Sequence, residues 1–170
     1  MRLFCLLLLS FTCVFAAGEL SNRRAPGFSL PENAYKSHDP QDYRGKILII
    51  DFMQVSCPHC DKFSVILEQA KAKYGDKIVV LSIVNPPSDQ KGVTEYVTKN
   101  KLSTPILFDC GQVAYSYMKP TSPQITIPHV FLIDEAGIIK NDFGYSPANS
   151  AIFEAKGLFA EIDKMLASKK

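Results

Sequence analysis

The chain has 170 residues, the size of one ordinary domain, and its hydrophobic content of 46% is sufficient for a buried core. Charged residues make up 21% of the sequence and the formal net charge is +2, which excludes a disordered chain and a strongly basic nucleic-acid-binding protein. Five cysteines are present, and their positions carry more information than their number.

Residues 1–17 have the pattern of a secretory signal peptide. Arg2 supplies the positive start, residues 3–15 form the apolar centre, and Ala16-Ala17 supply small residues for cleavage. The apolar run is short for a transmembrane helix, so we expect export to the periplasm or secretion, with no stable membrane span after cleavage. An uncleaved N-terminal anchor is the alternative. Residues 18–24 are then expected to form a flexible tail, and residues 25–170 the domain.

Beyond residue 25, segments typical of buried strands alternate with segments of helical spacing. An extended segment and a loop or short hairpin over 33–44 come first. Apolar runs without polar alternation predict strands that are buried on both faces, and apolar positions three and four apart predict helices. In chain order these are a strand at 48–52, a helix to 74, a strand at 78–84, a helix capped by Ser88, a strand at 105–108, a helix at 111–118, a strand at 130–133, a turn at 134–137, a strand at 138–143 and a helix at 148–167.

This order predicts an α/β domain with a mixed sheet between helical layers. Right-handed crossovers place the strand 48–52 in the middle of the sheet. Cys57 then lies at the carboxyl end of that strand, which is where open α/β sheets bind their ligands.

The sequence Cys57-Pro58-His59-Cys60 stands where the strand 48–52 gives way to a helix. A cysteine at a helix N-terminus faces unpaired backbone N–H groups and the positive end of the helix dipole, and both favour its thiolate. His59, when protonated, adds a second stabilising charge. Two cysteines at this spacing can close and reopen a disulfide, so the motif predicts a redox-active dithiol.

Together these features resemble the thioredoxin superfamily, and within it the exported TlpA/ResA-like thiol-disulfide oxidoreductases. The resemblance covers roughly residues 25–166. It is carried by Ala25-Pro26-Gly27-Phe28-Ser29-Leu30, Ile50-Asp51-Phe52, Cys57-Pro58-His59-Cys60, Ile127-Pro128 and Phe131-Leu132-Ile133-Asp134. It implies a thioredoxin-like mixed sheet sandwiched by helices. Residues 88–120 resemble the helix and strand that such proteins insert between the CxxC half and the cis-proline half.

The resemblance also implies a role for each residue of the site. Cys57 would be the nucleophile and Cys60 the buried resolving cysteine. Pro128 would be cis and would present the backbone of Ile127 to a substrate chain. Asp51 would be the buried carboxylate that takes the proton of the resolving thiol, with its own proton affinity raised by burial.

Two departures from the family pattern bear on its partners. Ser56 stands where tryptophan is usual, which makes the surface around Cys57 less apolar. The pair Pro58-His59 resembles the strongly oxidising oxidase DsbA, so we expect an oxidising couple. The resemblance implies protein thiols or disulfides as substrates, an upstream redox partner, no nucleic acid, no metal or organic cofactor, and a monomer.

Alternative functions remain open on the sequence alone. A peroxiredoxin places Thr or Ser three positions before its reactive cysteine, where this chain has Gln54. A Cu(I) chaperone would use the two thiolates with His59 or His129. The two cysteines of the motif as a fixed structural disulfide are a third possibility. Outside the motif, we expect His129 and His38 to face solvent and Cys110 to be a buried or idle thiol.

Overall fold

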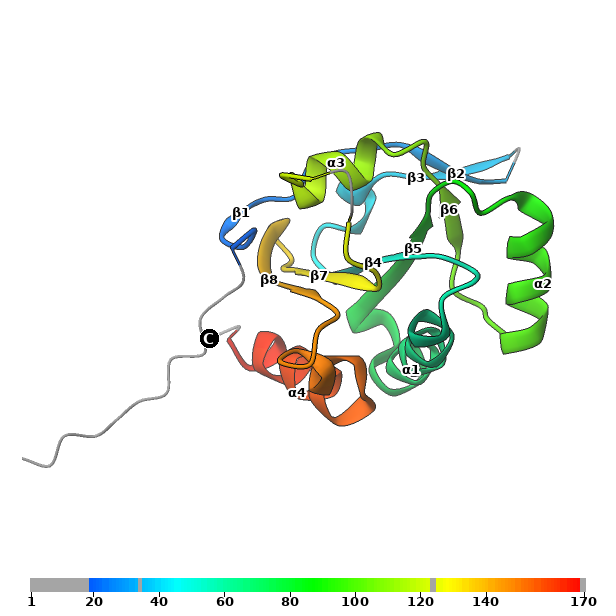
Figure 1. Cartoon of the computed structure of the whole chain (residues 1–170). Coiled ribbons are helices and arrows are strands. Elements are labelled where there is room, and N and C mark those ends of the chain that lie inside the picture. The colour runs from blue at the N-terminus through cyan, green and yellow to red at the C-terminus, as the bar shows by residue number, and fades with distance from the viewer. Residues whose placement is uncertain (1–18, 34, 123–124, 169–170) are drawn as a thin grey trace, which may run out of the picture.

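The computed structural model describes residues 19–33, 35–122 and 125–168, so the expected signal peptide at 1–17 lies outside the described residues. The strands and helices agree closely with the sequence expectation (Figure 1). The strands are β1 (Arg23–Arg24), β2 (Leu30–Asn33), β3 (Lys36–His38), β4 (Ile47–Met53), β5 (Ile78–Val84), β6 (Ile106–Phe108), β7 (His129–Ile133) and β8 (Ile138–Gly144). The α-helices are α1 (Pro58–Tyr74), α2 (Gln90–Asn100), α3 (Gln112–Met118) and α4 (Ala155–Ala167).

A six-stranded mixed sheet in the order β1-β8-β7-β4-β5-β6 organises the domain. β4, β5 and β6 are parallel, whereas β7 runs antiparallel to β4 and β8 antiparallel to β7. Phe52 near the end of β4 pairs with His129 at the start of β7. The segment that precedes β7, including Pro128, is therefore brought to the carboxyl end of β4. The expected α/β fold, with β4 near the centre of the sheet, is confirmed.

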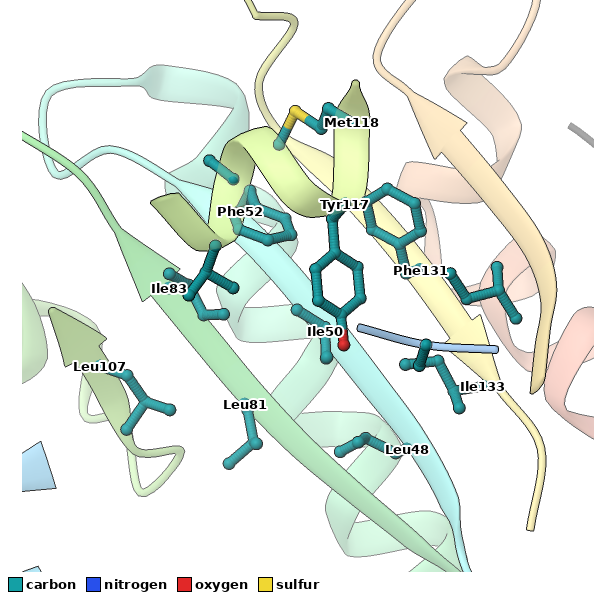
Figure 2. Packing of buried hydrophobic residues seen from close by; sticks show 14 residues of the cluster. Leu48, Ile50, Phe52, Leu81, Ile83, Leu107, Tyr117, Met118, Phe131 and Ile133 are labelled. Carbon is teal, nitrogen blue, oxygen red and sulfur yellow. The ribbon is translucent and has the colours of Figure 1, made fainter. Parts of the chain in front are cut away.

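The two faces of β4 serve two different cores, because successive side chains of a strand point to opposite sides. Leu48, Ile50 and Phe52 face α3, whose Tyr117 projects between them and Phe131 of β7 (Figure 2). All of these side chains are buried, and full burial of each large one stabilises the fold by about 1.5–3 kcal/mol. This core fixes the sheet from the side away from α1.

The opposite face is covered by α1 and α4, with α2 beside α1 near β6 (Figure 1). Ile47 and Ile49 of β4 pack there against Phe63 and Leu67 of α1. Asp51 continues the same alternation, so its carboxylate points toward α1 and away from solvent. The helix that carries the cysteine pair therefore lies directly over the acidic position of β4.

The N-terminal segment differs from the expectation of a tail over 18–24. Arg23–Arg24 form β1, which pairs antiparallel with β8 at the edge of the sheet. The backbone N–H of Asn22 donates to the carbonyl of Ile139 at 2.8 Å. The expectation of a loose tail is thus wrong for residues 22–24. Two polar arginines give no strand pattern; they are ordered by pairing with β8 and by hydrogen bonds from the Arg23 side chain to the carbonyls of Leu20 and Tyr117.

Two helix starts also differ from the expectation. Asp89 rather than Ser88 caps α2, and its side chain accepts the N–H of Gly92 at 2.7 Å. The last helix was expected from residue 148, but α4 begins only at Ala155. A 3-10 turn precedes it, and Glu154 adopts an extended backbone between the two.

His38 is buried and does not face solvent as expected. Its Nε2 lies 2.8 Å from a carboxylate oxygen of Glu32, and its Nδ1 hydrogen-bonds the hydroxyl of Tyr43. The hydrogen bond from His38 is the main reason that the pKa of Glu32 is lowered. The imidazole therefore joins the β2–β3 hairpin to the segment that enters β4.

Candidate functional site

The cysteine pair forms the N-terminus of α1. Cys57 is the N-cap residue, and its Sγ accepts the backbone N–H of Cys60 at 3.3 Å, while Pro58 occupies the first turn. Cys57 is half-buried and Cys60 is fully buried, and both are free thiols. The pair thus has one accessible and one protected sulfur. A thiolate at Cys57 would receive the N–H groups and positive dipole end of α1.

The buried thiol is held in its protonated form. Burial is the main cause that raises the pKa of Cys60, and its hydrogen bond with Cys57 and the nearby charge of Asp51 add to the effect. At neutral pH Cys60 therefore remains a thiol until a base takes its proton. Because of this difference, Cys57 is the sulfur suited to attack first, and Cys60 reacts only after it loses its proton.

Asp51 is the group placed to act as that base. It is completely buried in β4, with Ser82 and Val130 as its neighbours on β5 and β7. Burial raises the pKa of its carboxyl to about 8. Among the described residues neither carboxylate oxygen has a hydrogen-bond partner. An acidic side chain that is buried at this cost and titrates near neutral pH is typical of a functional group.

The Ile127–Pro128 peptide bond is cis, as the resemblance implies. Pro128 is buried, and its carbonyl accepts the backbone N–H of Tyr145 at 3.0 Å. Pairing of β7 with β4 places this proline at the sheet end from which the cysteine loop emerges. Asp51, Pro128 and the cysteine motif therefore lie together at one end of the sheet.

His59 lies exposed on the first turn of α1, and its ring stacks on Tyr145 with ring centres 4.0 Å apart and planes inclined by 27°. The sequence analysis did not include Tyr145. The one sequence feature that pointed to Tyr145 is its place as an aromatic residue directly after the strand at 138–144. Ser56, the position of the missing tryptophan, is exposed, and the backbone carbonyl of Gln54 accepts the N–H of Cys57 at 3.2 Å.

His129 is buried and does not face solvent as expected. Its ring stacks on Phe131 with ring centres 4.7 Å apart, and its Nε2 lies 3.5 Å from Asp142 of β8. Burial raises the pKa of Asp142, but the neighbouring His129 imidazole and the hydrogen bonds from Ser21 and Leu20 outweigh it, and the pKa is lowered. Because Ser21 and Leu20 both donate to Asp142, this pair anchors the N-terminal segment.

The remaining candidate residues do not form a second site within the part of the chain that the structure describes. Cys110 is exposed ahead of α3 rather than buried. Within the ranges that the structure describes, no group of three or more His, Cys, Asp or Glu side chains is arranged to hold a metal ion. In the same ranges, no helix has both the length and the apolar character needed to cross a membrane.

Comparison with known proteins agrees with this geometry. Residues 21–142 match the model of the AhpC/TSA family. The chain belongs to the AhpC/TSA family. It is 25% identical over 126 residues to thioredoxin-like protein YneN of Bacillus subtilis, across 73% of this chain and 71% of that protein. It is 32% identical over 104 residues to sporulation thiol-disulfide oxidoreductase A of the same organism, across 57% of this chain and 58% of that protein.

Solved structures show the same fold. The thioredoxin domain of a thiol-disulfide oxidoreductase from Bacteroides vulgatus superposes with a TM-score of 0.69 at 17% identity, covering 85% of this chain and 96% of that one. The chain is thus a thioredoxin-like family member whose relatives include thiol-disulfide oxidoreductases. Cys57 and Cys60 form its CxxC-type pair.

Proposed function

We propose that this protein is an exported thiol-disulfide oxidoreductase that exchanges disulfides with protein substrates through Cys57 and Cys60. The observation that carries the proposal is the pairing of a half-buried Cys57, which caps α1, with a buried Cys60 that stays protonated. The leader pattern of residues 1–17 supports export. Export suits this chemistry, because disulfides persist outside the cytosol.

The reaction is thiol–disulfide exchange. The Cys57 thiolate attacks one sulfur of a substrate disulfide, a mixed disulfide forms, and the first substrate sulfur leaves as a thiolate. The ionised fraction of Asp51, whose pKa is about 8, then takes the proton of Cys60. Cys60 attacks Cys57, which closes the Cys57–Cys60 disulfide and releases the second substrate thiolate. The protein has lost two electrons and the substrate has gained them. An upstream thiol partner resets the pair, and the reverse sequence oxidises a substrate dithiol.

The surrounding residues have supporting roles in this scheme. Pro128 and the backbone of Ile127 would receive the substrate chain beside Cys57. His59 would stabilise the thiolate when protonated and so shift the couple toward the oxidising end. Ser56 would offer partners a less apolar contact than the tryptophan that is usual there.

The direct test is the equilibrium of the Cys57–Cys60 pair with glutathione, followed by trapping. Cys60→Ser should accumulate mixed disulfides with substrate proteins from an extracytoplasmic extract, Cys57→Ser should abolish exchange, and the matched control Cys110→Ser should behave as wild type. His59→Pro should make the couple more reducing. Recovery of no mixed disulfide with Cys60→Ser would contradict the mechanism. Peroxide consumption that survives Cys60→Ser would favour a peroxiredoxin instead.

A further inference from the structure

Four aromatic side chains form a series of ring contacts beside the first turns of α1. His59 and Phe63 lie four positions apart and so share one face of the helix. His59 stacks on Tyr145, Tyr145 meets Phe153 edge to face at 5.3 Å, and Phe153 meets Phe63 at 4.8 Å. His59 is thus connected through two aromatic rings back to its own helix.

Tyr145 is fixed independently of His59. Its backbone N–H donates to the carbonyl of Pro128 at 3.0 Å, and the ring of Phe153, which is only 6% exposed, supports its side chain. The ring on which His59 lies is therefore held by the proline loop and by the core under α4. Tyr145 therefore presents a fixed ring face, and the imidazole of His59 stacks on it.

A stacked tyrosine face acts differently on the two protonation states of His59. The face of an aromatic ring carries partial negative charge, so it attracts an imidazolium more strongly than a neutral imidazole. The nearest acidic residue on the first turn, Asp61, already forms an ion pair with Lys99 at 2.7 Å. Within the described residues no ion pair involves His59 itself, so the ring of Tyr145 is its principal partner.

We propose that Tyr145 is a positioning residue that sets the redox equilibrium of the Cys57–Cys60 pair through His59. The inference rests on the proposed exchange function. By holding the imidazole of His59 at the first turn of α1, where its positive charge stabilises an anion, Tyr145 favours the Cys57 thiolate, and therefore the reduced form of the pair. Loss of the ring makes the protein a weaker oxidant.

The experiment measures the equilibrium constant for reduction of the protein disulfide by glutathione, together with the ultraviolet absorbance of the thiolate at neutral pH. A cation–π contact at an exposed site corresponds to about twofold to fivefold in an equilibrium constant. Tyr145→Ala should lower the constant about threefold, or about 14 mV for a two-electron couple, and should lower the thiolate absorbance. Tyr145→Phe keeps the face and should match wild type. Tyr115→Ala is the control, because Tyr115 lies 60% exposed on α3.

Two further variants separate electrostatics from packing. Tyr145→Leu retains apolar bulk against Phe153 but lacks the aromatic face, so it should behave as Tyr145→Ala does. In a His59→Ala background, Tyr145→Ala should produce no additional change. A normal equilibrium in Tyr145→Leu, or an undiminished shift without His59, would overturn the inference. A wild-type protein that does not exchange with glutathione would instead overturn the proposed function.

Discussion

Replacement of Asp51 by asparagine tests the cost of the buried carboxyl. Burial raises the pKa of Asp51 from 3.8 to about 8. Between about pH 4 and about pH 8 the folded chain therefore keeps a proton that the unfolded chain has released. The sign follows directly, because the state that binds more protons loses stability as pH rises. Wild type should become less stable across this window, with no further loss from this group above about pH 8.

The magnitude is large for a single side chain. One pKa unit corresponds to about 1.4 kcal/mol, so the contribution reaches about 4 kcal/mol at pH 7. An asparagine side chain does not titrate and has almost the shape of the protonated acid. Asp51→Asn should therefore match wild type near pH 4, within about 1 kcal/mol, and exceed it by several kcal/mol near pH 8.

Urea unfolding of the reduced proteins at a series of pH values measures this difference. Asp76→Asn, at an exposed carboxylate beyond α1, controls for the loss of one negative charge. The Asp51→Asn variant should also resolve mixed disulfides about 100-fold more slowly, since it lacks the acceptor for the Cys60 proton. A stability difference that stays constant from about pH 4 to about pH 8 would refute the burial argument, and an unchanged rate of mixed-disulfide resolution in Asp51→Asn would refute the role as base.

Two further predictions concern the support of α1 and α4. Glu68→Gln should cost about 2 kcal/mol in urea unfolding, because the carboxylate of Glu68 accepts hydrogen bonds from the N–H and hydroxyl groups of Ser103 and Thr104 ahead of β6. Gly157→Ala, which ordinarily stabilises a helix by about 1 kcal/mol, should lower the melting temperature instead. Its added Cβ would lie 1.9 Å from the carbonyl oxygen of Ala151, so an unchanged or raised melting temperature would contradict the packing.

The aromatic set around His59 connects the two halves of the site. Tyr145 contacts His59 on α1 through its ring and Pro128 through its backbone. A shift in the backbone of Pro128 would therefore be transmitted to His59 on α1 through Tyr145.

Much of the site could be predicted because its chemistry is local in sequence. An apolar run predicts β4, and cysteine spacing at the following turn predicts the dithiol. An acid inside that run stands out as costly, and this identifies Asp51. Pro128 required the family resemblance, since a single proline does not reveal its isomer. The register of β4 with β7 then brings it to the same end of the sheet.

The order of strands and helices, the cysteine pair and the acid on β4 can be predicted from the sequence, because each depends on neighbours within one or two turns of chain. Three features become visible only in the folded domain: the edge strand at Arg23–Arg24, the burial of His129 against Asp142, and the contact of Tyr145 with His59. The partners of the two arginines and of Tyr145 lie far away along the chain, and His129 meets Asp142 across the hairpin of β7 and β8. These contacts depend on how β8 and its neighbours are placed in the sheet, and no local pattern of hydrophobicity or charge records them.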